Sequence, residues 1–160
     1  MSFPKKDAFS EGLVVEFTMD HGNSWVGNFA KTWEGWATGV YPELGPHAAL
    51  VVAGGAGYIV DADERRLVRE LGSDIKHVWF QPELGAFIVS NELWFEAFDA
   101  SRTLWRSRRF SWDEIRNMSR DGLTVTGEAY DPTGADAWRP FSLNLENGEV
   151  AGGSYNGPPM

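Results

Sequence analysis

The sequence predicts an all-β fold: antiparallel meanders, propeller-blade-like or arranged as a twisted sheet or partial propeller, with little helix. Short runs of β-branched and aromatic residues alternate along the chain with Gly, Pro, Asn and Asp, the residues of turns. We find no window of ten or more residues with the i, i+3, i+4, i+7 apolar spacing of an amphipathic helix. The 18 glycines and 8 tryptophans suit a fold of many turns whose short strands need large side chains.

The N-terminal part of the chain contains two clear strand patterns and one ambiguous stretch. Residues 13–19 (LVVEFTM) and 48–53 (AALVVA) are predicted strands, and residues 24–41 are rich in Gly and Trp with low helix propensity. Residues 54–57 (GGAG) predict a hairpin or bulge. A phosphate loop is rejected there because neither a following Lys-Ser/Thr nor a following helix is present.

Strand patterns continue to the C-terminus. Further strands are predicted over residues 58–60, 66–71, 75–80, 86–89, 93–98, 103–110, 115–118, 123–130, 138–145 and 149–152. Asp121-Gly122 lies between two apolar-bearing runs and predicts a hairpin. Short helices over residues 61–71 and 111–118 stay as minor alternatives.

A weak repeat is visible. Residues 47–71, 74–110 and 114–153 share a layout in which an aromatic-bearing strand ends at Asp61, Asp99 or Asp131 and a turn follows. This layout is similar to a propeller blade, and the first 46 residues could supply strands for a fourth. A minimal propeller, an open stack of meanders, and a single twisted sheet or barrel all remain open.

Length and composition favour one all-β domain over residues 1–155, followed by a flexible tail over residues 156–160. A chain of 160 residues can bury a sizeable core without a covalent staple. The absence of cysteine excludes disulfide scaffolds, thiolate zinc sites and cysteine nucleophiles.

The charge balance bears on the partners. Asp and Glu number 23 against 14 Lys and Arg, a net charge of -9. Such a surface repels nucleic acids and anionic membranes and suits a basic protein partner. The first residues contain no apolar signal segment, and no run approaches the ~18 apolar residues of a spanning helix, so a cytoplasmic location is expected.

Two groups of residues are candidates for binding. Trp25, Trp33, Trp36 and Tyr41 lie in the glycine-rich stretch, where exposed aromatic residues could form a binding surface. Arg106 and Arg108 belong to a basic cluster that is either a solvated strand face or an anion- or partner-contact patch. The remaining tryptophans, Trp79, Trp94, Trp105, Trp112 and Trp138, are predicted mainly to pack in the core.

Nothing in the sequence signals catalysis. His21, His47 and His77 lie in separate segments without metal-ligand spacing, and we expect His47 and His77 to be surface or hydrogen-bonded residues. No Gly-x-Ser-x-Gly nucleophile elbow is present. The sequence therefore predicts no catalytic residue, no metal and no cofactor.

Several segments together resemble a group of small bacterial proteins. These are residues 24–29 (SWVGNF), 53–58 (AGGAGY), 105–113 (WRSRRFSWD), 127–130 (GEAY), 138–141 (WRPF) and 148–155 (GEVAGGSY). The resemblance implies an all-β, blade-like bacterial protein. It implies no activity and assigns no site residue.

These observations favour a non-enzymatic protein-interaction module, such as an acidic bacterial immunity- or inhibitor-type protein that covers a basic partner. One alternative is a carbohydrate- or small-ligand-binding protein, hydrolytic or not, that uses tryptophan platforms and carboxylates. Another is an assembly component that closes a propeller by oligomerising.

Overall fold

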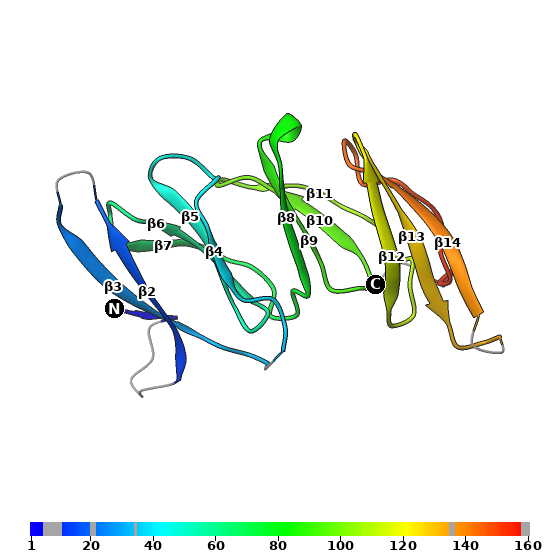
Figure 1. The fold of residues 1–160 in the computed structure, drawn as a ribbon, viewed down its shortest axis with the longest axis horizontal. Coiled ribbons are helices and arrows are strands. Elements are labelled where there is room, and N and C mark those ends of the chain that lie inside the picture. The colour runs from blue at the N-terminus through cyan, green and yellow to red at the C-terminus, as the bar shows by residue number, and fades with distance from the viewer. Residues whose placement is uncertain (5–10, 20–21, 34, 135–136, 158–160) are drawn as a thin grey trace. The chain divides into compact units, whose positions relative to one another are not determined.

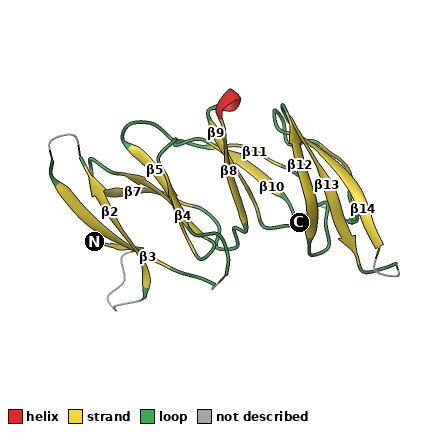
Figure 2. Cartoon of the chain, viewed as in Figure 1, coloured by secondary structure: helices red, strands yellow, loops and turns green. Residues whose placement is uncertain are grey.

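A computed structural model describes residues 1–4, 11–19, 22–33, 35–134 and 137–157. Regular structure in these residues is almost entirely β, and the all-β prediction is confirmed (Figure 1). The one helical segment described is a 3-10 turn, η1 (Pro82–Leu84), drawn red in Figure 2. In this part of the chain no helix has the length and apolarity needed to cross a membrane.

The strands form four separate sheets, so a single twisted sheet or closed barrel is not the arrangement observed. Sheet A has the order β1-β3-β2 and contains β1 (Ser2–Phe3), β2 (Gly12–Thr18) and β3 (Ser24–Ala30). Sheet B contains β4 (Gly39–Tyr41), β5 (Ala48–Ala53), β6 (Ala56–Asp61) and β7 (Arg66–Glu70). Sheet C contains β8 (His77–Gln81), β9 (Ala86–Ser90), β10 (Phe95–Phe98) and β11 (Thr103–Arg106). Sheet D contains β12 (Ile115–Asp121), β13 (Thr124–Asp131), β14 (Ala137–Asn144) and β15 (Val150–Gly152).

Sheets B, C and D have their strands side by side in chain order, the arrangement of a four-stranded meander. The predicted strand over residues 48–53 has the bounds of β5, and the Asp121-Gly122 turn joins β12 to β13 as expected. The strand expected over residues 103–110 ends at Arg106, and at the next position the Ser107 hydroxyl oxygen accepts the Phe95 N–H in place of a backbone carbonyl.

Both minor helix alternatives are wrong. Residues 66–70 form β7 and pair with β6, and residues 115–121 form β12 and pair with β13. Isolated helices of this length are marginal in water, whereas a strand beside an existing strand gains ladder hydrogen bonds at once.

The backbone divides into two compact units, residues 1–78 and 79–160, which we describe separately. The prediction of one domain over residues 1–155 stays a prediction. Residues 158–160 of the predicted tail lie outside the described residues.

The core of residues 1–78 lies between sheets A and B and is built from aromatic rings. Phe29 is fully buried and stacks on Phe3 with ring centroids 5.0 Å apart, and Phe17 stacks on Trp25 at 4.5 Å. Tyr58 from sheet B donates its hydroxyl to the Ala30 carbonyl (2.9 Å). Aromatic pairs of this kind add to the stability that their burial provides.

The core of residues 79–160 lies between sheets C and D and follows the same principle. Phe95 stacks on Phe110 with centroids 5.4 Å apart, and Phe110 contacts Phe141 at 4.7 Å. Trp79 and Trp105 pack against this cluster, and the Trp105 indole donates to the Leu145 carbonyl (2.9 Å). The expected packing role is therefore confirmed for these two tryptophans.

The aspartates of the predicted repeat share one structural role. Asp61, Asp99 and Asp131 each stand at or just after the end of a strand and accept backbone N–H groups from the following turn. Asp61 and Asp131 also form ion pairs, with Arg66 and Arg139 respectively. The repeat is incomplete, because Asp131 ends the second strand of its sheet whereas Asp61 and Asp99 follow the third.

Acid should weaken the turn at Asp131. The Thr133 hydroxyl, the Arg139 guanidinium and the Thr133 N–H hold the pKa of this carboxyl below its usual value. Because the folded pKa is depressed, this stabilisation is present above the unfolded pKa of about 4 and is lost as the pH falls through the folded pKa. Urea unfolding from about pH 6 to pH 2 should show a smaller acid-induced loss in Asp131→Asn and Thr133→Val than in the parent protein. An identical pH dependence in all three would contradict this role.

Replacing Phe95 with alanine should strongly lower the free energy of unfolding. The side chain is fully buried between Phe110 and Phe141, so Phe95→Ala leaves a cavity as well as losing burial. We expect the free energy of unfolding to fall by about 3–5 kcal/mol, measured by urea titration. Thr126→Ala, at an exposed position of β13, is the control and should cost less than about 1 kcal/mol. Similar losses in the two variants would show that the aromatic core is not the main source of stability.

Candidate functional site

Trp33, Trp36 and Lys76 form an exposed aromatic surface in residues 1–78, which we call the Trp33–Trp36 surface. Trp33 has 57% of its surface exposed, the most of any tryptophan in the chain. Its ring lies 5.8 Å from that of Trp36 at an interplanar angle of 37°. The Lys76 ammonium lies 5.3 Å from the Trp36 ring centroid, within the range of a cation–π contact.

Backbone hydrogen bonds hold both tryptophans on the turn between β5 and β6. The Trp33 N–H donates to the Gly54 carbonyl (2.9 Å), and the Gly55 N–H donates to the Ala37 carbonyl (2.9 Å). The Thr38 hydroxyl accepts the Gly54 N–H (3.0 Å). This part of the Gly- and Trp-rich stretch is therefore fixed on a two-residue hairpin turn.

The two turn residues must be glycine for two separate reasons. Gly54 and Gly55 have φ of 54° and 87°, the left-handed values that a tight hairpin turn requires at both central positions. A Cβ on Gly54 would lie 2.3 Å from the Trp33 carbonyl oxygen, and one on Gly55 would lie 2.7 Å from Cε3 of Trp36. Of the hairpin and the bulge that the sequence predicts here, the structure has the hairpin, and no sequence pattern indicates that Trp33 and Trp36 rest on it.

Trp25 and Tyr41 do not join this surface. Trp25 is buried in the core between sheets A and B and donates its indole N–H to the Ala62 carbonyl (2.8 Å). Tyr41 lies on β4 and is partly buried; burial, and then the nearby Glu43 carboxylate, raise the pKa of its hydroxyl. The alternation of β3 turns Trp25 inward, which its place in a glycine-rich segment did not reveal.

Arg108 is occupied by the protein's own backbone. Its guanidinium donates to the carbonyls of Gly152 (2.6 Å), Tyr155 (3.0 Å) and Arg109 (3.1 Å), and its Nε donates to Val150 (3.4 Å). These bonds tie β15 and the residues after it to the loop beyond β11. The geometry gives Arg108 a structural role.

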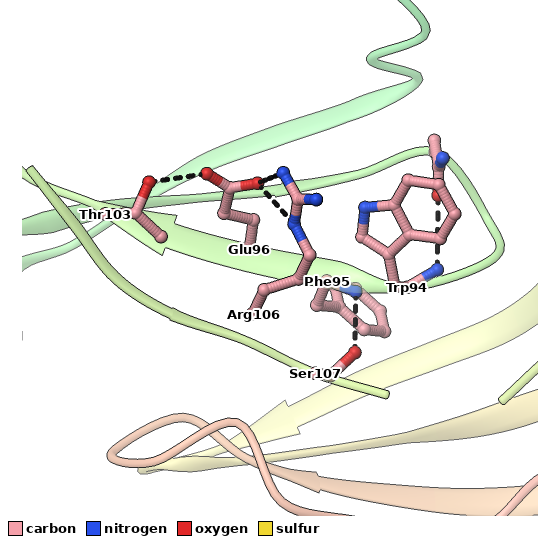
Figure 3. A network of polar contacts seen from close by, with 7 residues as sticks. Trp94, Phe95, Glu96, Thr103, Arg106 and Ser107 are labelled. Carbon is pink, nitrogen blue, oxygen red and sulfur yellow. Dashed lines mark hydrogen bonds and ion pairs between the residues drawn. The ribbon is translucent and has the colours of Figure 1, made fainter. Parts of the chain in front are cut away.

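Arg106 is held by a neighbouring carboxylate. Figure 3 shows Glu96 on β10 accepting hydrogen bonds from the Thr103 hydroxyl (2.8 Å) and from Arg106 Nε (2.8 Å). The guanidinium also lies 5.7 Å from the Trp94 ring centroid. Arg106 and Arg108 are both exposed and both line a surface groove of about 670 Å³, but only Arg106 forms an ion pair with a carboxylate there.

The polar lining of that groove includes two asparagines and one carboxylate. Asn144 and Asn147 line it, and each already accepts a backbone N–H from its own turn. Glu149 is the one carboxylate in its wall. Two other surface cavities of the described structure likewise hold one carboxylate each, Glu11 and Glu70, so the carboxylate pair of a hydrolytic site is not formed in any of the three.

The described residues contain no group of three or more His, Asp or Glu side chains that could hold a metal ion. His47 is exposed and pairs with Asp63, in line with the surface role expected for it. His77 lies at the start of β8, and His21 lies outside the described residues.

Comparison with known proteins adds no assignment. No protein-family model matches the chain, and a search of curated proteins gives no significant match. The resemblance to small bacterial proteins stays a prediction.

Alanine at Gly55 should disturb the Trp33–Trp36 surface, whereas alanine at Gly22 should not. Both glycines have positive φ (87° and 76°), but a Cβ on Gly22 would meet nothing within 4 Å. Gly22→Ala should therefore lower the free energy of unfolding, measured by urea titration, only by the backbone penalty of about 1 kcal/mol. Gly55→Ala should lower it further, because the new Cβ would also press on Trp36, and it should shift the indole NMR resonance of Trp36. Equal costs with an unmoved Trp36 resonance would contradict the seating of Trp36 on this turn.

Proposed function

We propose that the protein is a non-enzymatic protein-interaction module that contacts its partner through the Trp33–Trp36 surface. The observation that carries this proposal is the exposure of Trp33, 57%, which is larger than that of any other tryptophan in the protein. Tryptophan is among the residues most enriched at the energetic centres of protein interfaces.

The way the surface is built supports binding. Trp33 and its neighbours are tied to the β5–β6 turn by backbone hydrogen bonds, so little freedom of the segment is lost when a partner arrives. An aromatic anchor that is already ordered binds more tightly than one that must be ordered on contact.

The charge distribution favours a basic partner. Arg66, Arg106, Arg116 and Arg139 are each paired with a carboxylate, so these four of the 14 basic side chains are neutralised within the protein. The net charge of -9 then rests on acidic side chains in excess of these pairs. An acidic protein with an aromatic anchor fits an immunity- or inhibitor-type role in the bacterial cytoplasm, which we include in the proposal.

Assembly is a second candidate, favoured by a specific observation. Sheet A has three strands, and its outer face exposes Val14 (66%) and Val26 (48%). Sheets B, C and D have the consecutive strand order of propeller blades, and pairing between copies could complete a propeller. Light scattering separates the candidates, since assembly requires a mass above that of the monomer.

The main proposal predicts a stoichiometric partner that depends on Trp33. Immobilised parent protein should retain such a partner from a bacterial lysate, and Trp33→Ala should weaken its binding about 30-fold or more, the loss expected at a centre of binding energy. Trp112→Ala is the matched control, because Trp112 is also exposed (39%) but lies in residues 79–160. Retention should fall as salt increases if the partner is basic.

Two outcomes would count against the proposal. One is a partner that binds Trp33→Ala as well as it binds the parent protein. The other is a change in intrinsic tryptophan fluorescence with members of a glycan panel that is lost in Trp33→Ala, which would favour the carbohydrate-binding alternative instead.

A further inference from the structure

A second, smaller pocket lies within residues 79–160, away from the Trp33–Trp36 surface in the sequence. It has a volume of about 350 Å³ and lies where β8 approaches β12 and β13. Its walls are mainly apolar: Trp79, Phe80, Met118 and Val125, with Ser119 and Arg120 as the polar members. An apolar cavity of this size with a few polar groups is typical of small-ligand sites.

A β-bulge brings Arg120 to this pocket. Before the bulge, Ile115 opposes Ala129 on the core side of sheet D, and the next residue points outward. The register shifts between Arg116 and Ser119, after which Arg120 opposes the buried Val125. Because strand side chains alternate, an unbroken β12 would turn Arg120 to the other face.

The bulge holds one residue, Asn117, in an unfavourable backbone conformation, and side-chain hydrogen bonds keep it there. Asn117 has a φ of 52°, the left-handed region that a side chain disfavours. Its amide donates to Glu128 Oε2 (2.8 Å), which also accepts Arg116 Nε (2.9 Å). Bulges and strained residues of this kind concentrate beside functional sites, where they redirect a side chain.

Arg120 differs from the arginines that are neutralised within the protein. Arg66, Arg106, Arg116 and Arg139 pair with carboxylates, whereas Arg120 donates to the neutral Gln81 Oε1 (2.8 Å). Gln81 is 1% exposed, and its amide is engaged in turn by Glu83. The guanidinium is therefore held in place at the pocket, and no carboxylate among the described residues forms an ion pair with it.

The pocket wall also holds a donor without an acceptor. The indole N–H of Trp79 is out of contact with solvent and has no hydrogen-bond partner among the described residues. Buried polar groups without partners are rare in folded proteins and call for an explanation.

We propose that this pocket binds a small ligand with an apolar body and a carboxylate. The apolar walls would hold the aliphatic or aromatic body, and Arg120 would take the carboxylate in a charge-assisted hydrogen bond. The proposal rests on residues of sheets C and D and does not depend on the Trp33–Trp36 surface. The competing explanation is that an inward cation and a bulge only protect the exposed edge strand β12 from pairing with other chains.

Calorimetric titration of the full chain with phenylacetate and hexanoate, and with their uncharged amides, tests the proposal. The acids should bind, and the amides should bind at least about tenfold more weakly because they lack the charge that Arg120 recognises. Arg120→Gln should weaken binding of the acids by about tenfold or more, and Met118→Ala should weaken binding of acids and amides alike. Arg139→Gln removes the same charge elsewhere on sheet D and should leave the affinities unchanged.

The proposal is overturned if acids and amides bind equally well, if Arg120→Gln binds the acids as the parent does, or if neither acid binds at about 10 mM, where even a weak small-ligand site would be filled. The acid–amide comparison uses the parent protein alone, so it decides the question even if Arg120→Gln does not fold. Edge protection by itself predicts no binding, together with aggregation of Arg120→Gln on storage.

Discussion

A short strand can turn only a few side chains toward a neighbouring sheet, and each unit of this protein meets that constraint with aromatic rings. Phe3, Phe17 and Phe29 fill the space between sheets A and B, and Phe95, Phe110 and Phe141 fill the space between sheets C and D. Aromatic side chains bury the largest area per position, so a few inward residues suffice. The turns, edges and surface sites are all carried by sheets that these rings hold together.

Several charged residues in this protein form hydrogen bonds with backbone groups of nearby turns and strand ends. Asp61, Asp99 and Asp131 satisfy the N–H groups of the turns that follow them, and Arg108 satisfies the carbonyls around β15. Because those carbonyls are neutral, the Arg108 guanidinium keeps its positive charge while it holds this segment.

The two candidate sites arise from two different departures from regular strand geometry. The Trp33–Trp36 surface depends on a glycine turn whose missing side chains leave room for the Trp33 backbone and the Trp36 indole, and the Arg120 pocket depends on a bulge that reverses the alternation of β12. In each case the departure places a side chain where an unbroken strand could not place it. Binding residues on such rigidly held irregularities need little further ordering when a ligand arrives.

The sequence by itself determined the all-β class, the hairpin at Asp121-Gly122, an irregular turn at Gly54-Gly55 that was either a hairpin or a bulge, and the turn role of the three aspartates, because these depend on residues adjacent in the chain. It could not separate Trp25 from Trp33, which share one glycine-rich segment, because only the pairing of β3 turns Trp25 inward. Likewise, Arg106 and Arg108 look alike in the sequence, yet one bonds a side chain and the other a set of distant carbonyls. The tertiary structure alone decided the Arg120 pocket, since a shift of one residue in strand register exchanges the two faces of a strand and leaves no mark on composition or spacing.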